Sequence, residues 1–269
     1  MKAIPKVEPE TLERKDLLHR FGEEFSFTIA KNPRQLQDVF ALRHDVFIKE
    51  IGYDMEEDES HSLERDEHDS RAIHCFIRHK RTGLIAGCLR LIAPSEIDSN
   101  HGELLPIEAH GDGILNHDTF RPDILPRNQI CEVSRLAIAK PFRERPKDDT
   151  SQTSNIFTLE ERKVFPIILI GLFLCTYTLV GLTGKRHVFA MMEPKLPRLL
   201  SYSGFHFSKV SGDIFYHGKR NAFYIDHQVA EQQVHQDLTQ LYAAIQKELS
   251  PQLDVTNAFK TAIVQPEMT

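Results

Sequence analysis

The chain has 269 residues and a formal net charge of -6 at pH 7; 41% of its residues are apolar and 27% are charged. This length and composition are those of a globular protein, and we expect a single large domain with terminal extensions. A chain of this charge lacks the basic face that nonspecific nucleic-acid binding needs, so nucleic acid is not expected as a partner.

The cysteines and the N-terminal residues indicate the cellular compartment of the protein. Cys75, Cys88, Cys131 and Cys175 lie far apart and show neither metal-binding nor redox spacing. They are typical of buried thiols in a reducing compartment. Residues 1–21 are polar and carry no apolar segment before a small-residue cleavage site. A secretory signal is therefore not predicted, and the protein is expected in the cytoplasm.

The first regular elements of the main domain are a strand and a helix. Residues 25–30 alternate apolar side chains with small ones, which is the period of a half-buried strand. An Asn-Pro pair at 32–33 then begins a helix. Apolar residues recur at intervals of three and four along this helix, which places Arg43 and Phe47 on or beside its buried stripe.

An acidic run at 54–69 precedes a predicted hairpin. Most such runs are solvated loops. This one contains no glycine, which a calcium loop needs at its centre, so a metal site is not expected. Residues 72–80 and 84–92 predict two strands with Gly83 in the turn. The second strand is apolar on both faces except for Arg90, so it is predicted to be central and to carry a buried guanidinium.

A long loop leads to the strand that carries the main chemical signal. Prolines and glycines throughout 94–127 prevent long regular elements, and a connection of this length is usually a lid or a pocket wall. Residues 131–138 then read as a central strand. Glu132 and Arg135 lie inside this strand, and burying such charges is costly unless they pair with opposite charges or take part in chemistry. A bulge residue between them would bring both side chains to one face of the sheet.

Residues 164–182 contain no charged side chain, which by length alone makes them a candidate membrane span. Proline, glycine, threonine and tyrosine dilute this segment, and the strands on both sides of it belong to one predicted sheet. The better interpretation is a core helix that connects 131–138 to a parallel strand at 187–192. No transmembrane span is expected, and a peripheral contact with a membrane is left open.

The rest of the chain predicts a short helix, two closing strands and a terminal amphipathic helix, at 193–200, 205–210, 214–226 and 227–249. Residues 1–20 predict a frayed helix that docks on the domain. The expected organisation is an N-terminal extension at 1–24, a main domain at 25–226, and a C-terminal helix and tail at 227–269.

Several positions together resemble the acyl-homoserine lactone synthases in their order and local spacing. These positions are Arg43, Phe47, Gly52, Tyr53, Glu64, Asp66, Asp69, Arg90, Glu132 and Arg135. The chain is more similar still to the acyltransferases associated with PEP-CTERM/exosortase systems and to the related N-acyl amino acid synthases. That similarity covers roughly 25–226 and includes Leu-Pro-Ile-Glu at 105–108, Met-Glu-Pro at 192–194 and His-Gly-Lys-Arg at 217–220.

The resemblance implies an α/β protein with the Gcn5-related N-acetyltransferase (GNAT) fold, also called the acyl-CoA N-acyltransferase fold, in which helices flank a mixed, twisted sheet. It implies an acyltransferase that moves a long-chain fatty acyl group from an acyl-carrier protein thioester to the amine of an amino acid or similar small acceptor. Acyl-carrier protein would be a co-substrate, with no bound cofactor. Two alternatives stay open: a lactone synthase that uses S-adenosylmethionine, and a non-catalytic acyl-binding module.

The resemblance also implies roles for single residues. Glu132 is the candidate general base, with Arg135 beside it as the second catalytic residue. The expected acceptor side consists of Arg43, Phe47, Tyr53, Glu64, Asp66, Asp69 and Arg90. Its three carboxylates are expected to pair with Arg43, Arg90 and Arg135 in one ionic cluster, because a buried charge needs a partner.

Two features differ from the relatives. The lactone synthases carry tryptophan where this chain has Tyr53, which favours an acceptor other than S-adenosylmethionine. The coenzyme A enzymes of the wider superfamily hold pyrophosphate with a glycine-rich loop after the central strand, whereas residues 140–147 here contain no glycine and are basic. The expected binding residues for an acyl-carrier protein donor are Lys140, Arg143, Arg145 and Lys147.

Overall fold

The computed structural model describes residues 9–94, 104–111, 113–143, 156–215, 218–254 and 258–259. Its strands are β1 (Phe25–Ile29), β2 (Glu57–Asp58), β3 (Leu63–Glu64), β4 (Ala72–His79), β5 (Ile85–Ile92), β6 (Ile130–Ile138), β7 (His187–Met192), β8 (Ser208–Lys209), β9 (Ile214–Phe215) and β10 (Lys219–Asp226). Strands β2 and β3 form a small hairpin. The others form one sheet in the order β1-β4-β5-β6-β7-β10-β8, with β9 paired to β10.

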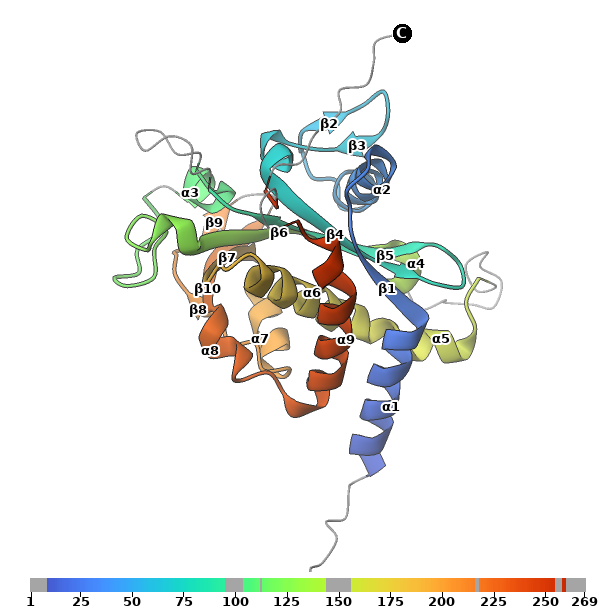
Figure 1. The fold of residues 1–269 in the computed structure, drawn as a ribbon. Helices are drawn as coiled ribbons and strands as arrows, with labels where there is room; N and C mark the ends of the chain where they lie inside the picture. The colour runs from blue at the N-terminus through green and yellow to red at the C-terminus, as the bar shows by residue number, and fades with distance from the viewer. Residues whose placement is uncertain are drawn as a thin grey trace, which may run out of the picture.

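The helices cover both faces of this sheet (Figure 1). They are α1 (Pro9–Glu24), α2 (Pro33–His44), α3 (Pro106–Gly111), α4 (Lys140–Arg143), α5 (Leu159–Val164), α6 (Ile168–Leu182), α7 (Lys195–Ser201), α8 (His227–Glu231) and α9 (Thr239–Leu249). Helices α1, α6 and α9 lie on one face, and α2 lies on the other with the β2–β3 hairpin beside it. The predicted mixed sheet flanked by helices is therefore confirmed.

Helix α2 begins at the predicted place because Asn32 caps it. The Asn32 side chain accepts a hydrogen bond from the backbone N of Gln35 at 2.9 Å, and the Gln35 side chain accepts one in return from the backbone of Asn32. The helix continues into a π-helical turn, Asp45–Glu50. Such turns often occur at functional sites, and this one carries Phe47.

The apolar segment after β6 forms a core helix. By length and composition alone Leu159–Leu182 could cross a membrane, but 72% of its most apolar window is buried inside the protein. Helix α6 packs against β4, β5 and β6 on one side and against α9 on the other. Each fully buried leucine in it contributes roughly 1.5–3 kcal/mol relative to an exposed one, so the helix is stabilised by the sheet. Pro166 interrupts its start with a 3₁₀ turn, Phe165–Ile167.

The sheet splays between β6 and β7. These two strands are parallel and pair only where Ile130–Glu132 lies beside His187–Phe189. Beyond that point β6 continues to pair with β5, while β7 pairs with β10 up to Met192. The chain reaches β7 through α6, which confirms the predicted strand-helix-strand crossover. The opening between the two strands is the place where a ligand can enter the sheet.

Three local expectations are corrected. The first closing strand is shorter than predicted, because Phe205 and Phe207 pack against Phe173 of α6 in irregular chain and only Ser208–Lys209 of this segment forms a strand. The second predicted strand is divided into β9 and β10. The predicted helix 227–249 is broken between α8 and α9. At the break the His235 ring accepts a hydrogen bond from the Asp237 backbone, so His235 starts a new helical turn. The N-terminal helix extends to Glu24 and runs directly into β1.

Candidate active site

A β-bulge in β6 determines how the central strand presents its charged residues. Cys88 pairs with Ala137 and Arg90 with Ser134, so two residues of β6, Arg135 and Leu136, lie opposite one residue of β5. Arg135 has a φ of 54°, which is uncommon for a residue with a side chain. The expected bulge is therefore present, and its residue is Arg135 itself. It brings Arg135 to the same face as Glu132 and Ser134.

Glu132 is a buried carboxylate with one oxygen bound and the other without a partner. The backbone N of Ile107 in α3 donates to its Oε2 at 2.7 Å, whereas Oε1 has no hydrogen-bond partner among the described residues. Burial raises the pKa of Glu132 to about 8, against the opposing effects of the Ile107 amide, Arg90 and Arg135. A carboxyl group with this pKa can both take up and release a proton near neutral pH.

The six predicted charged residues form a closed ring beside Glu132, in which every carboxylate bridges two arginines. Glu64 binds Arg43 and, at 3.0 Å, Arg135. Asp66 binds Arg135 at 2.7 Å and Arg90 at 2.5 Å. Asp69 closes the ring with contacts of 2.6 Å to Arg90 and 2.8 Å to Arg43. The predicted ionic cluster is confirmed.

The positive and negative charges of the ring balance one another. Three arginines face three carboxylates, and the side chains of Arg43, Glu64, Asp69 and Arg90 are fully buried. Burial alone would raise the pKa of Asp69, but Arg43 and Arg90 hold it well below its usual value. Asp69 therefore stays ionised at neutral pH. Arg135 is the ring member that also lines the neighbouring cavity.

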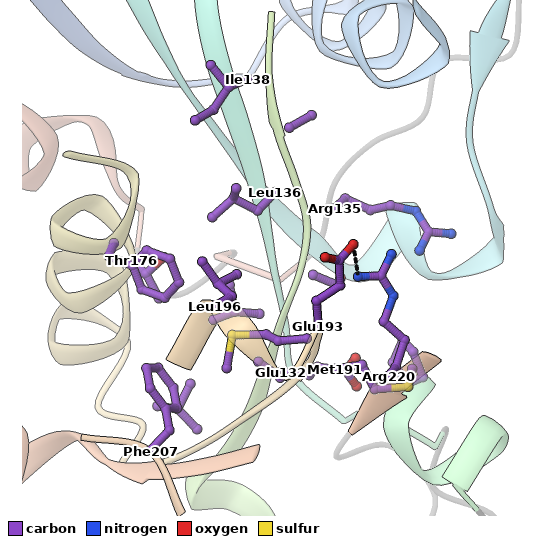
Figure 2. Close-up of a pocket in the computed structure, with 18 of the residues that line it drawn as sticks. Glu132, Arg135, Leu136, Ile138, Thr176, Met191, Glu193, Leu196, Phe207 and Arg220 are labelled. Carbon is purple, nitrogen blue, oxygen red and sulfur yellow. Dashed lines mark ion pairs between the residues drawn. The ribbon is translucent and has the colours of Figure 1, made fainter. Parts of the chain in front are cut away.

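A cavity of about 400 Å³ occupies the opening between β6 and β7 (Figure 2). Its size is within the range of small-molecule sites. The end toward α6 is mostly apolar and is lined by Leu136, Phe173, Thr176, Val180, Leu196 and Phe207. The opposite end is polar and is lined by Phe47, Tyr53, Glu132, Arg135, Glu193 and Arg220. Figure 2 shows Leu136 directed toward α6 and Arg135 directed away from it.

The polar end of the cavity is bordered by three residues from different parts of the chain. Arg220 of β10 donates to the Tyr53 hydroxyl at 2.6 Å, and its Nη1 lies 3.1 Å from Oε1 of Glu193 (Figure 2). The Phe47 and Tyr53 rings stack, with centroids 6.3 Å apart. Gly52, with a φ of 77°, ends the π-helical turn and lets the chain present Tyr53 there. This end therefore combines aromatic faces with a cation and an anion.

The structure sorts the sequence-predicted residues into three groups. Those that line the cavity are Phe47, Tyr53, Glu132, Arg135 and Arg143. Those that do not line it are Arg43, Glu64, Asp66, Asp69, Arg90 and Lys140, the first five being members of the ring. Arg145 and Lys147 lie outside the described residues. Arg143 donates to the Ile138 carbonyl at 2.6 Å and pairs with Glu50, which fixes α4 beside the cavity.

Sequence reasoning assigned no role to Glu193, Arg220 or Ile107. Glu193 and Arg220 lie in stretches that carried the resemblance, and their side chains meet only because β7 pairs with β10. Ile107 acts through its backbone N, which no side-chain pattern reveals. Among the described residues, no group of three or more His, Cys, Asp or Glu side chains could hold a metal ion.

Comparison with known proteins agrees with this geometry. Residues 42–150 match the family model of the acetyltransferase (GNAT) domain. Together with the mixed sheet flanked by helices, this match defines the fold as the acyl-CoA N-acyltransferase fold and supports an acyltransferase enzyme. A search of curated proteins gives no match.

Three solved structures share this fold at low identity. FeeM, an N-acyl amino acid synthase from uncultured soil microbes, is 15% identical with a TM-score of 0.51, over 81% of this chain and 97% of that chain. BjaI, a CoA-dependent acyl-homoserine lactone synthase, is 19% identical with a TM-score of 0.52, over 82% of this chain and 89% of BjaI. TofI, solved with an inhibitor and MTA, is 17% identical with a TM-score of 0.52, over 82% of this chain and 96% of TofI.

Proposed function

We propose that this protein transfers a long-chain fatty acyl group from an acyl-carrier protein thioester to the amine of an amino acid or similar small acceptor. The observation that carries the proposal is the cavity in the splayed sheet, whose lining combines an apolar end with Glu132, a buried carboxylate that has one oxygen without a hydrogen-bond partner among the described residues. Both substrates of an acyl transfer have a place in it, the acyl chain toward α6 and the amine toward Arg135.

Glu132 supplies the proton transfer. The attacking amine must lose a proton as it forms a bond to the thioester carbon, and Oε1 of Glu132 has no competing partner. The carbonyl oxygen becomes an oxyanion before the sulfur leaves as a thiol and the amide forms. The bulge at Arg135 takes a backbone amide out of the ladder between β5 and β6, and such an amide suits this oxyanion.

The polar end of the cavity suits an acceptor with a carboxylate. A guanidinium binds a carboxylate through two parallel hydrogen bonds, and Arg220 is placed at this end. Glu193, which pairs with Arg220 here, has a side chain that is 60% exposed, so a substrate carboxylate can take its place while Glu193 turns to solvent. Tyr53 and Phe47 offer aromatic faces to the acceptor.

An acyl-carrier protein donor is supported by the segment that follows β6. Helix α4 carries the exposed cations Lys140 and Arg143 beside the cavity, and the residues from 139 to 147 include no glycine. Backbone amides of a glycine-rich loop would suit the pyrophosphate of coenzyme A, whereas side-chain cations suit an acidic carrier surface. The similarity to exosortase-associated acyltransferases supports a long acyl chain, and the free, buried cysteines support a cytoplasmic enzyme.

The test is to incubate the purified protein with long-chain acyl-carrier protein and a pool of amino acids, simple amines and S-adenosylmethionine, and to identify acylated products by mass spectrometry. We expect an N-acyl amino acid that Glu132→Gln abolishes. A homoserine lactone would instead establish the lactone synthase. Acyl binding without any product would overturn the enzyme proposal and leave an acyl-binding module.

A further inference from the structure

Helix α3 holds Glu132 through a single backbone group. The N–H of Ile107 in its first turn donates to Oε2 of Glu132 at 2.7 Å. This bond fixes the carboxylate so that Oε1, which has no partner, is the oxygen left for chemistry. The orientation of Glu132 therefore depends on where the first turn of α3 is placed.

That turn is fixed by Glu108. Its Oε2 accepts from the backbone N of Leu105 at 2.8 Å, and its own backbone N donates to the Leu105 carbonyl at 2.9 Å. Its Oε1 accepts from Nη1 of Arg127 at 2.6 Å. Arg127 belongs to the 3₁₀ turn Arg127–Gln129, which leads directly into β6. The ion pair thus joins the helix that orients Glu132 to the strand that carries it.

We propose that Glu108 and Arg127 are positioning residues for the general base: their ion pair holds the first turn of α3 against β6, keeps the Ile107 amide on one oxygen of Glu132, and leaves the other oxygen to the acceptor amine. Neither residue touches the cavity. This inference rests on the proposed function, because it gives Glu132 the role of base.

The charges around Glu132 determine the direction of the expected effect. Those that face it are Arg90 from β5, Arg135 from its own strand and Glu108 from α3. The Ile107 amide and the two arginines lower the pKa of Glu132, and Glu108 raises it. Arg127→Met weakens the hydrogen bond from the Ile107 amide to Glu132, and it removes the positive charge that offsets Glu108. Both changes raise the pKa of Glu132.

The experiment measures this pKa directly, by carbon-13 NMR titration of the Glu132 side-chain carboxyl, assigned with Glu132→Gln. We expect Arg127→Met to raise the pKa of Glu132 by about one unit, which corresponds to about tenfold less ionised base near neutral pH. The acid limb of the kcat profile should move upward by the same amount, with the KM for the acyl donor unchanged. Arg127→Lys should restore most of the wild-type profile.

Two further variants keep the inference falsifiable. Glu108→Asp retains the charge but shortens the link between Leu105 and Arg127, so it should shift the titration in the same direction. Arg121→Met removes a half-buried arginine that pairs with the exposed Asp123 in the same connection, and it should change neither the Glu132 titration nor the kcat profile. A folded Arg127→Met or Glu108→Asp protein with an unchanged Glu132 titration overturns the inference. Activity that survives Glu132→Gln overturns the proposed base instead, while the NMR titration still reports on the ion pair.

Discussion

Nε of Arg135 donates to Oε1 of Glu64 at 3.0 Å, although 71 residues separate the two in the chain. The contact depends on the bulge in β6, since a regular strand would direct position 135 to the face opposite position 132. It also closes the ring of six charges, in which each member has two partners of opposite sign. Loss of one member therefore leaves two charges underpaired at once.

Replacing Arg90 should unfold the protein more than it changes any substrate contact. Arg90 is fully buried and binds Asp66 and Asp69, so Arg90→Ala should lower the free energy of unfolding by about 3–5 kcal/mol. Urea denaturation at neutral pH measures the change. Arg121→Ala, which removes an exposed pair with Asp123, should cost about 0–1 kcal/mol. A fully folded and fully active Arg90→Ala variant would show that the ring is dispensable.

Activity should follow the ionisation of Glu132. Because burial raises the pKa of Glu132 to about 8, kcat should increase with pH up to that value and then level off. Glu132→Gln removes the base and should lower kcat by about 100- to 10,000-fold while the protein stays folded. A steady-state pH profile and circular dichroism check both expectations, and wild-type kcat that is flat from about pH 6 to pH 9 would contradict them.

Glu132 should give the free energy of unfolding a pH dependence opposite to that of kcat. The folded-state pKa of Glu132 lies above its unfolded value of about 4.3, so its contribution is fully present below that value and is lost as pH rises through about 8. The free energy of unfolding of the wild type should therefore fall more steeply over this window than that of Glu132→Gln. Parallel urea titrations at several pH values measure the difference, and equal slopes would argue against a buried, protonated carboxyl.

Much of this architecture could be predicted from the sequence, because its signals are local or concern unpaired charge. Alternation predicted β1, and the uncharged segment between two strands predicted the crossover through α6. The ring was predictable because buried arginines need carboxylates and an acidic run was available. Arg220 and Glu193 were missed, since their pairing depends on the register between β7 and β10. The Ile107 amide was missed because every residue except proline carries one.

The apolar end of the cavity should set the acyl-chain length. Leu196 of α7 is half-buried and lines this end, so Leu196→Trp should fill space there with little strain on the core. We expect turnover to shift toward shorter acyl chains. Leu199→Trp is the matched control, because Leu199 lies on the same helix, is 54% exposed and does not line the cavity. Competition between short- and long-chain donors measures the shift, and an unchanged ratio in Leu196→Trp would place the acyl chain elsewhere.

Charge reversal beside α4 should affect the donor more than the acceptor. Lys140→Glu combined with Arg145→Glu should raise the KM for acyl-carrier protein and leave the KM for the acceptor unchanged, because complementary charge between two proteins acts mainly on the rate of their encounter. Wild-type turnover with this donor should fall as ionic strength rises. Lys247→Glu, an exposed lysine on α9, is the control. Equal or better turnover with acyl-coenzyme A in the wild type would contradict the assigned donor.

Arg220 should decide whether the acceptor must carry a carboxylate. It lies at the polar end of the cavity, held by Tyr53 and by an exposed Glu193, so Arg220→Met removes a cation from the acceptor side without removing the base. We expect the KM for amino acids to rise by about 10- to 100-fold, since a charge-assisted hydrogen bond contributes about 1.5–3 kcal/mol. The KM for an amine without a carboxylate should not change. Lys219→Met removes the neighbouring lysine of β10, which pairs with Asp213 and does not line the cavity, and it should leave both constants unaltered. An equal rise in KM for amino acids and simple amines in Arg220→Met would show that this arginine supports the fold of the site and does not bind the acceptor carboxylate.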